Sequence, residues 1–285
     1  MVKNTALILE GGGFRGIFTA GILEVFLENN IFFDSVYGVS AGAAYGVSYV
    51  SKQAGRNLAV NDFIGDKRYC SWSNLLKDGS MFSWEFIYET IPQFIIPFDY
   101  EELKYSESKF YVGTTDCETG IPEFFLLNKA DKKDFRIILA ASSSLPFIAP
   151  LVHFDGKTLM DGGLADSIPF EFALNQGSDR AVVILTQPKN YIKDPLKYPA
   201  LFKWYYRKYP KVYELLVNRA ERYNDSIRKL EELEKDGQVY VVRPQKTIEI
   251  KRVENNPQKT AAVYHSAMKQ AIKELPELQN WLGQE

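Results

Sequence analysis

The chain has 285 residues, of which 46% are hydrophobic and 25% are charged, and its formal net charge at pH 7 is −2. This length buries a sizeable core without disulfide or metal support, and the composition excludes a disordered or fibrous protein. The near-neutral charge provides no basic field that would draw the protein to nucleic acid. Aromatic residues reach 14%, whereas there are only two His and two Cys. We therefore expect no metal site and no disulfide framework.

The N-terminal sequence MVKNTALILEGGG does not resemble a targeting segment. Its apolar run is about five residues long, whereas a secretory signal has a longer run and a small-residue cleavage site. No segment approaches the roughly 20 uninterrupted apolar residues of a membrane span. These features predict a cytoplasmic protein and leave open a peripheral contact with the inner membrane surface.

Strand and helix patterns alternate over the first 53 residues. A β-rich run at 5–9 ends at glycines, and apolar residues from Phe14 onward then follow the helical i, i+3, i+4 spacing. Gly21 on that helical face predicts a close approach to a sheet. A second strand at 31–39 and a second helix at 41–53 complete a βαβα unit. Such units are typical of parallel sheets with helices on both faces.

Farther along the chain, regular patterns are interrupted by one irregular segment. Residues 57–100 show no regular period and concentrate aromatic side chains. Asp155-Gly156 between two short apolar runs is a strong hairpin signal. The other expected elements are strands at 109–115, 124–127, 151–154, 157–160, 180–185 and 238–243, and helices at 131–141, 198–235 and 258–275.

The turn after the first strand, GGGFRG at residues 11–16, fits the pattern GxGxxG between a strand and a helix. In a dinucleotide-binding fold such a turn holds pyrophosphate, and an acidic residue about 20 positions later holds the ribose. Asp34 lies near that spacing. Alternatively, successive glycine amides at a helix N-terminus stabilise an oxyanion. A tight turn without a ligand is the third interpretation, and the motif alone does not choose among them.

A second motif, Gly38-Val39-Ser40-Ala41-Gly42, fits GxSxG between a predicted strand and a predicted helix. This is the context that a nucleophile elbow requires. The small flanking residues permit a sharp turn that presents the Ser40 hydroxyl at the positive end of the helix. The alternative is that Ser40 only caps the helix.

A nucleophilic serine needs a base, and three residues are candidates. His153 falls inside the predicted hairpin and His265 in a C-terminal helix, and neither has the glycine-rich context of a catalytic loop. Asp161 ends the hairpin strand and precedes Gly162 and Gly163. A carboxylate accepts a serine proton directly when partial desolvation raises its proton affinity. Taken alone, Asp-Gly-Gly is also an ordinary turn.

In this order, GGGFRG, GVSAG and DGG resemble the patatin-like phospholipase family of lipid acyl hydrolases. Smaller stretches extend the resemblance over about residues 5–185, namely Thr115-Asp116, Thr119-Gly120, Ala141-Ser142-Ser143 and Leu145-Pro146-Phe147. The resemblance implies a three-layer α/β/α core with a mostly parallel central sheet. It also implies a Ser–Asp dyad, with Ser40 as nucleophile and Asp161 as general base. The implied oxyanion hole consists of the amides of Gly11, Gly12 and Gly13, with Arg15 bracing the loop and Gly16, Gly38, Gly42, Gly162 and Gly163 as supporting motif residues.

The implied function is a serine acyl hydrolase that cleaves carboxylic esters of lipids, as a phospholipase A, lysophospholipase or esterase does, without a metal or cofactor. A nucleotide- or dinucleotide-binding protein that uses residues 11–16 and Asp34 is the alternative. A rise in charge and proline content near 188–199 marks a seam. We therefore expect a catalytic domain at 5–188 and a C-terminal α/β extension at 189–285 that packs on it. The oligomeric state is not indicated.

Two aromatic segments bear on the lipid ester substrate. The first, 72–98, walls an acyl channel or covers Ser40 as a lid, or else forms ordinary core packing. The second, 202–213 (FKWYYRKYPKVY), mixes aromatic and basic residues as a surface at a lipid headgroup layer does, or else forms a solvated helix. The sequence leaves both choices open.

Overall fold

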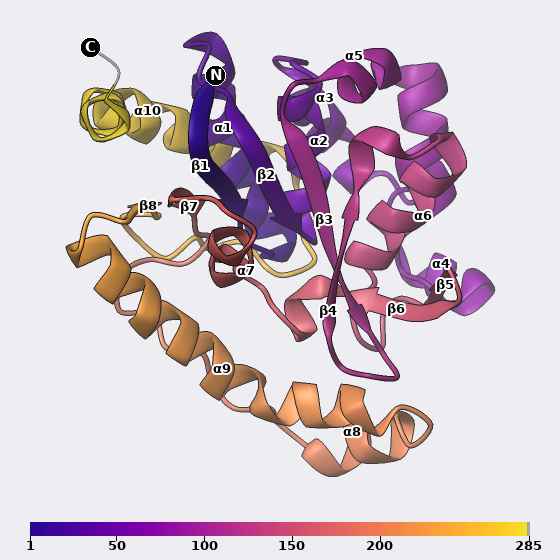
Figure 1. Cartoon of the computed structure of the whole chain (residues 1–285). Helices are drawn as coiled ribbons and strands as arrows, with labels where there is room; N and C mark the ends of the chain where they lie inside the picture. The colour runs from indigo at the N-terminus through magenta and orange to yellow at the C-terminus, as the bar shows by residue number, and fades with distance from the viewer. Residues whose placement is uncertain (284–285) are drawn as a thin grey trace.

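The computed structural model describes residues 1–283 and shows a mixed sheet with helices on both faces (Figure 1). The strands are β1 (Val2–Leu9), β2 (Phe33–Val39), β3 (Lys109–Asp116), β4 (Pro122–Leu126), β5 (Val152–Phe154), β6 (Lys157–Asp161), β7 (Arg180–Ile184) and β8 (Val239–Val242). The α-helices are α1 (Ile17–Glu28), α2 (Ala41–Val50), α3 (Arg56–Asn61), α4 (Trp72–Asp78), α5 (Tyr100–Tyr105), α6 (Lys132–Ser142), α7 (Phe170–Asn175), α8 (Pro199–Tyr205), α9 (Pro210–Lys235) and α10 (Pro257–Leu282). Short 3-10 turns are η1 (Gly13–Gly16), η2 (Asp62–Gly65), η4 (Leu127–Lys129) and η5 (Gly162–Leu164), and η3 (Phe86–Ile95) is a π-helix of ten residues.

The sheet has eight strands in the order β5-β6-β3-β2-β1-β7-β8, with β4 paired to β3 outside this path. The strands β3, β2, β1, β7 and β8 run parallel to one another. By contrast, β4 and β6 pair antiparallel with β3, and β5 pairs antiparallel with β6. The predicted α/β class with a mostly parallel central sheet is therefore confirmed.

Alternating side chains of β1 enter two different cores. Leu7 and Leu9 join the core that contains residues of α1, α2, α6 and α10. Ala6 and Ile8 join the core under α7 and α9. Because successive side chains of a strand point to opposite faces, this alternation explains the layers of helices on both sides of the sheet.

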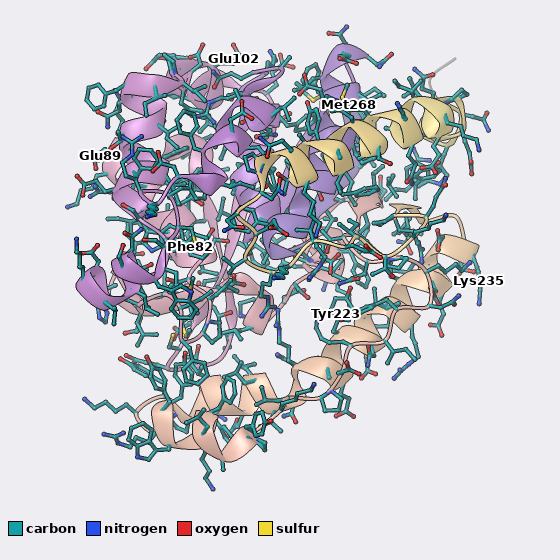
Figure 2. The ribbon with its side chains drawn as sticks, turned by 180° about the vertical axis from the view of Figure 1, so that it is seen from behind. Phe82, Glu89, Glu102, Tyr223, Lys235 and Met268 are labelled. Carbon is teal, nitrogen blue, oxygen red and sulfur yellow. The ribbon has the colours of Figure 1, made fainter. Side chains whose placement is uncertain are left out.

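The C-terminal segment takes part in the same architecture. β8 pairs parallel with β7 and extends the sheet, while α9 and α10 cover opposite faces. Figure 2 shows the molecule from behind, with α10 and its Met268 in front. A Cβ atom on Gly21 of α1 would lie 2.4 Å from the Tyr264 carbonyl oxygen of α10. The close approach predicted for Gly21 is thus made to a helix and not to a sheet.

Three predicted elements differ from the structure. The irregular segment 57–100 contains short helices and a π-helical stretch, η3, that accommodates Pro92. The predicted helix 198–235 is two helices, because Pro210 begins a new one at a position where its missing N–H has no partner to lose. The last helix extends to Leu282, beyond the predicted end at 275.

Candidate active site

Ser40 sits in a sharp turn between β2 and α2. Its backbone angles, φ 54° and ψ −118°, are uncommon for a residue other than glycine. A Cβ atom on Gly42 would lie 2.2 Å from the Leu9 carbonyl oxygen, so the motif needs glycine at this position. The Ser40 N–H donates to Ser142 Oγ at 2.9 Å, and Ser142 Oγ donates to the Gly113 carbonyl at 2.6 Å. These contacts hold the elbow against β3.

β3 brings the ends of β2 and β6 together. β2 pairs with β3 as far as Val39 opposite Gly113, and β6 begins its pairing with Asp161 opposite Thr114. β4 pairs with the opposite edge of β3 over Tyr111–Thr115. β2 and β6 therefore pair with the remaining edge of β3, one after the other along the strand. Ser40 and Asp161 therefore meet, and Ser40 Oγ donates to Asp161 Oδ2 at 2.7 Å.

The Asp161 carboxylate is buried, with only 2% of the residue exposed. Its Oδ1 accepts the Gly163 N–H at 2.8 Å, and its main chain bonds to Thr115 and Ser144. Burial raises the pKa of Asp161, while the Ser40 hydrogen bond, the charge of Arg219, the Gly163 amide and the charge of Arg252 act in the opposite direction. A buried carboxylate with a raised pKa is suited to accept a proton from serine.

The glycine-rich loop differs from the expectation in two details. The Gly11 N–H already donates to the Ser167 carbonyl at 3.2 Å, so it is not free for an oxyanion. Among residues 1–283, the N–H groups of Gly12 and Gly13 have no acceptor. The predicted bracing by Arg15 is not seen: within the same residues its buried Nε has no hydrogen-bond partner. Gly16 lies at the end of η1, immediately before α1.

The two histidines lie away from the dyad. His153 is exposed on β5 and contacts Thr158 Oγ1 at 3.3 Å. His265 is exposed on α10 beside the Tyr264 ring. In the described part of the chain, the hydrogen bond of the Ser40 hydroxyl goes to Asp161 and to no imidazole.

Asp34 does not share a site with the glycine loop. It lies near the start of β2 and accepts the Asn4 N–H at 3.0 Å, whereas the loop follows the opposite end of β1, where Leu9 pairs with Gly38. Four residues of strand separate the two ends by about 13 Å. This placement does not support the dinucleotide interpretation, which needs both groups at the carboxyl ends of the strands.

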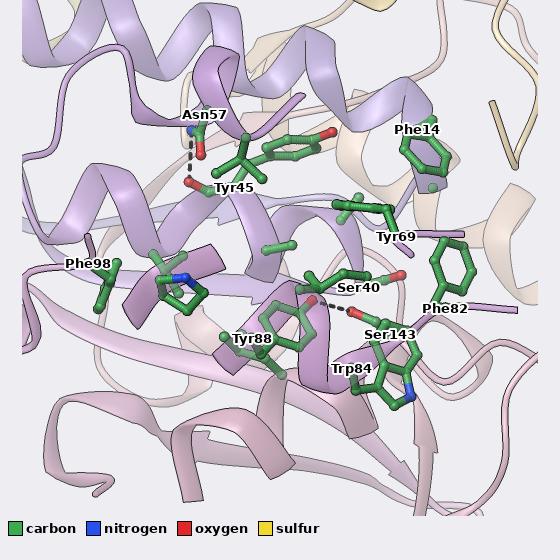
Figure 3. Close-up of a pocket in the computed structure, with 18 of the residues that line it drawn as sticks. Phe14, Ser40, Tyr45, Asn57, Tyr69, Phe82, Trp84, Tyr88, Phe98 and Ser143 are labelled. Atoms are coloured by element: carbon green, nitrogen blue, oxygen red, sulfur yellow. Dashed lines mark hydrogen bonds between the residues drawn. The ribbon is translucent and has the colours of Figure 1, made fainter. Parts of the chain in front are cut away.

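A mainly apolar cavity of about 110 Å³ opens beside Ser40 (Figure 3). Four members of the predicted aromatic segment line it: Phe82, Trp84, Tyr88 and Phe98. The Tyr88 hydroxyl and Ser143 Oγ are 3.2 Å apart and share a hydrogen bond. Two other members do not line the cavity. Phe86 packs on Phe63 at a centroid distance of 6.3 Å, and Phe94 is 77% exposed.

Two supporting residues were not assigned a role from the sequence. Ser142 fixes the elbow, as described above. Arg219 of α9 donates from Nε to the Gly163 carbonyl at 2.8 Å and thereby holds the turn after Asp161. No local pattern points to Arg219, because the contact arises only when α9 packs on the sheet.

Among residues 1–283, no group of three or more His, Cys, Asp or Glu side chains is arranged to hold a metal ion. Within this range, no helix combines the length and apolar character needed to cross a bilayer. Cys70 and Cys117 are free thiols.

The sequence is similar to known protein families and to individual proteins. A family model described as patatin-like phospholipase matches residues 7–174, and a domain of unknown function (DUF6363) matches 209–283. The uncharacterized protein YjjU of Escherichia coli is 29% identical over 204 residues, which are 70% of this chain and 56% of YjjU. Lysophospholipase nte1 of Neurospora crassa is 30% identical over 189 residues, 62% of this chain and 12% of that protein.

Two further proteins are similar to this chain. Neuropathy target esterase sws of Drosophila melanogaster is 26% identical over 188 residues, 64% of this chain and 13% of its own length. VipD of Legionella pneumophila, a solved structure, aligns with a TM-score of 0.49 at 12% identity over 96% of this chain and 67% of VipD. The chain thus spans about half of YjjU and a small part of the esterases. Because the family model covers more than half of its residues, the chain belongs to the patatin-like phospholipase family.

Proposed function

We propose that the protein is a lipid acyl hydrolase in which Ser40 attacks a carboxylic ester and Asp161 is the general base. The observation that carries this proposal is the 2.7 Å hydrogen bond from Ser40 Oγ to Asp161 Oδ2 beside an aromatic cavity. Family membership and relatives named lysophospholipases support lipid esters as the substrate class. The acyl chain occupies the cavity and the leaving group lies toward the glycine loop.

In the first half of the reaction, Ser40 Oγ forms a bond to the carbonyl carbon of the ester. Its proton passes to Asp161 Oδ2 along the existing hydrogen bond, and the carbonyl oxygen becomes an oxyanion. The free N–H groups of Gly12 and Gly13 are the donors for this oxyanion. One such donor contributes about 3 kcal/mol of transition-state stabilisation in enzymes of this kind.

In the second half, Asp161 returns its proton to the departing alcohol or lysophospholipid, which leaves an acyl-Ser40 ester. A water molecule in the place of the leaving group then loses its proton to Asp161 and attacks the acyl carbon. Collapse of the second oxyanion releases the fatty acid and restores the Ser40 hydroxyl. All proton transfers use the one buried carboxylate.

A fluorophosphonate probe tests the reactive serine, and analysis of lipid products tests the substrate class. We expect the wild type to be labelled and Ser40→Ala to remain unlabelled, with His153→Ala as a control that keeps its labelling. Products from a mixed lipid extract, measured by mass spectrometry, should include free fatty acids that Ser40→Ala does not release. Labelling that persists in Ser40→Ala would contradict the assignment of the nucleophile.

We also propose that α8 rests on a lipid surface. Tyr198, Leu201, Trp204 and Tyr205 are between 50% and 79% exposed, and Lys203, Arg207 and Lys208 lie among them. Exposed aromatic side chains interspersed with basic ones suit the headgroup layer of an anionic membrane. Phe147 follows the Ser143–Pro146 segment near the cavity. Its ring meets the Phe202 ring edge to face at a centroid distance of 4.4 Å and so connects α8 to the site.

A further inference from the structure

Four cationic side chains gather around the glycine loop and the turn after Asp161. Arg15 belongs to the loop itself, whereas Lys193, Arg219 and Arg252 come from the part of the chain that follows β7. The charges of Arg219, Arg252 and Arg15 all act on the Lys193 ammonium. Among residues 1–283, none of the four forms a salt bridge with a carboxylate.

Two of the cations contact their neighbours through the side chain: Lys193 packs on an aromatic ring, and Arg219 bonds to the Gly163 carbonyl. Lys193 Nζ lies 3.9 Å from the centroid of the Tyr223 ring, and the Tyr223 hydroxyl donates to Glu10 Oε1 at 2.8 Å. Tyr223 is labelled on α9 in Figure 2. The Arg252 carbonyl accepts the Phe14 N–H at 3.3 Å, and Arg252 lines the same cavity as Ser40 and Gly13. Arg252 therefore lies in the cavity of Ser40, and Arg219 lies on the turn after Asp161.

The four positive charges of the cluster outnumber the negative charges that face them. Glu10 and Asp161 are the carboxylates whose charges act on it. Burial, followed by the charges of Arg219, Arg252 and Arg15, lowers the pKa of Lys193 to about 7, although Glu10 acts in the opposite direction. Tyr191 and Tyr223 are the other titratable groups against it. Unpaired like charges in a shielded place are unfavourable unless an anion joins them.

We propose that Arg15, Lys193 and Arg252 bind the phosphate of an anionic lipid headgroup next to the scissile ester. This inference rests on the proposed function and specifies its substrate class: lysophospholipids that end in a phosphate monoester, such as lysophosphatidic acid. A headgroup that carries a choline or ethanolamine cation would bring a further positive charge against the cluster. The free N–H groups of Gly12 and Gly13 stay available for the ester oxygen, because the side chains hold the phosphate.

Binding is tested first, without catalysis, in Ser40→Ala protein. Isothermal titration with glycerol 3-phosphate should show binding that Lys193→Gln and Arg252→Gln each weaken about 10- to 100-fold, the range for a lost charged hydrogen bond. Lys197→Gln, an exposed lysine of the same segment, is the matched control and should bind as the parent does. If both cluster variants bind glycerol 3-phosphate with the affinity of the parent, the proposal is overturned. It is also overturned if the parent binds inorganic phosphate with the same affinity as glycerol 3-phosphate.

The same titration also measures whether Lys193 takes up a proton on binding. A bound phosphate raises the pKa of this lysine, so at mildly alkaline pH the complex takes up a proton from the buffer. We expect the binding enthalpy to depend on the buffer's ionisation enthalpy in the parent and not in Lys193→Gln. A buffer dependence that is the same in both proteins contradicts the assignment of Lys193.

Turnover then connects the cluster to the reaction. With hexanoyl esters, which avoid a lipid interface, kcat/KM for the lysophosphatidic acid should exceed that for the matching monoacylglycerol at least about tenfold. Lys193→Gln should remove this preference and change the monoacylglycerol value less than about twofold. Arg252 is not used in this comparison, because its charge also lowers the pKa of Asp161. Equal losses on both substrates would show a general structural role and overturn the proposal. If no Ser40-dependent turnover occurs but the binding result holds, the proposed function fails and the anion site stands.

Discussion

The cavity beside Ser40 has two walls that are built in different ways. One wall, the polar wall, consists of Ser40 and Gly13 of the glycine loop, with Asp161 hydrogen-bonded to Ser40. Its atoms are fixed by strand ends and main-chain hydrogen bonds. The other, the aromatic wall, consists of Phe82, Trp84, Tyr88 and Phe98 from the irregular segment between α4 and α5. The Trp84 ring stacks on Phe82 at 5.3 Å and on Tyr88 at 5.8 Å. We infer that the polar wall determines the reaction and the aromatic wall the acyl group.

The end of α6 connects the two walls. Ser142 holds the main chain of Ser40, and the adjacent Ser143 shares a hydrogen bond with the Tyr88 hydroxyl. Phe14 of the glycine loop also stacks on Phe82 of the aromatic wall, at a centroid distance of 6.3 Å. Substitutions should separate into those that lower kcat on every ester and those that change the preferred chain length.

The largest expected effect comes from Asp161→Asn in the polar wall. Loss of a general base lowers kcat by about 10²- to 10⁴-fold. The variant should nevertheless keep or gain stability at neutral pH, because burial raises the pKa of this carboxyl and so makes its charged form unfavourable in the folded state. This stability difference is absent at pH values below both the folded and unfolded pKa. Esterase assays and urea denaturation measure the two quantities, and a large loss of stability would indicate a structural role instead.

The next effect is a shift of the pH profile in Arg219→Gln. In the proposed mechanism, activity requires ionised Asp161 and falls as the pH drops through the raised pKa of this carboxyl. The Arg219 charge lowers that pKa, so its removal should move the acid limb of kcat/KM to higher pH, with up to about tenfold lower activity on the limb for one pH unit. Arg219→Lys keeps the charge and should leave the limb near its original position. A limb that moves equally in both variants would point to the lost hydrogen bond to Gly163.

In the aromatic wall, Trp84→Ala should alter chain-length preference more than rate. Each buried methylene of an acyl chain contributes about 0.8 kcal/mol, or about fourfold in kcat/KM, until the cavity is full. Removal of the indole lengthens the cavity, so the plateau in a series of p-nitrophenyl esters should move to longer chains. Phe94→Ala, an exposed residue of the same segment, serves as the control. A uniform loss across the series would contradict the division between the walls.

The smallest effect concerns the surface helix α8 and applies to vesicle binding. Leu201→Ala combined with Trp204→Ala should reduce co-sedimentation with anionic liposomes several-fold and leave hydrolysis of a soluble ester unchanged. Trp72→Ala is a matched control, because Trp72 is 70% exposed and Trp204 is 65% exposed. Equal binding of all three proteins would remove α8 from the lipid contact.

The sequence predicts the polar wall better than the aromatic one. GxSxG and DGG each place a side chain through local backbone geometry, which a short pattern can encode. By contrast, two other contacts depend on packing between segments that are distant in the sequence. These are the hydrogen bond from the Gly11 N–H to the Ser167 carbonyl and the one from Arg219 to the Gly163 carbonyl. Residues 57–100 form short helices whose apolar faces have no sustained period, so the predicted irregular segment concealed α3, α4 and η3. The cationic cluster is likewise visible only after folding.

The sharing of one edge of β3 by β2 and β6 has a consequence for synthesis. Ser40 and Asp161 are 121 residues apart in the chain, and the serine acquires its base only when β6 docks beyond the end of β2. Domains fold as the N-terminal part leaves the ribosome first. Under the proposed mechanism, a nascent chain that has formed the elbow but not the hairpin has a serine without a base. Reactivity then begins only after β6 has paired with β3.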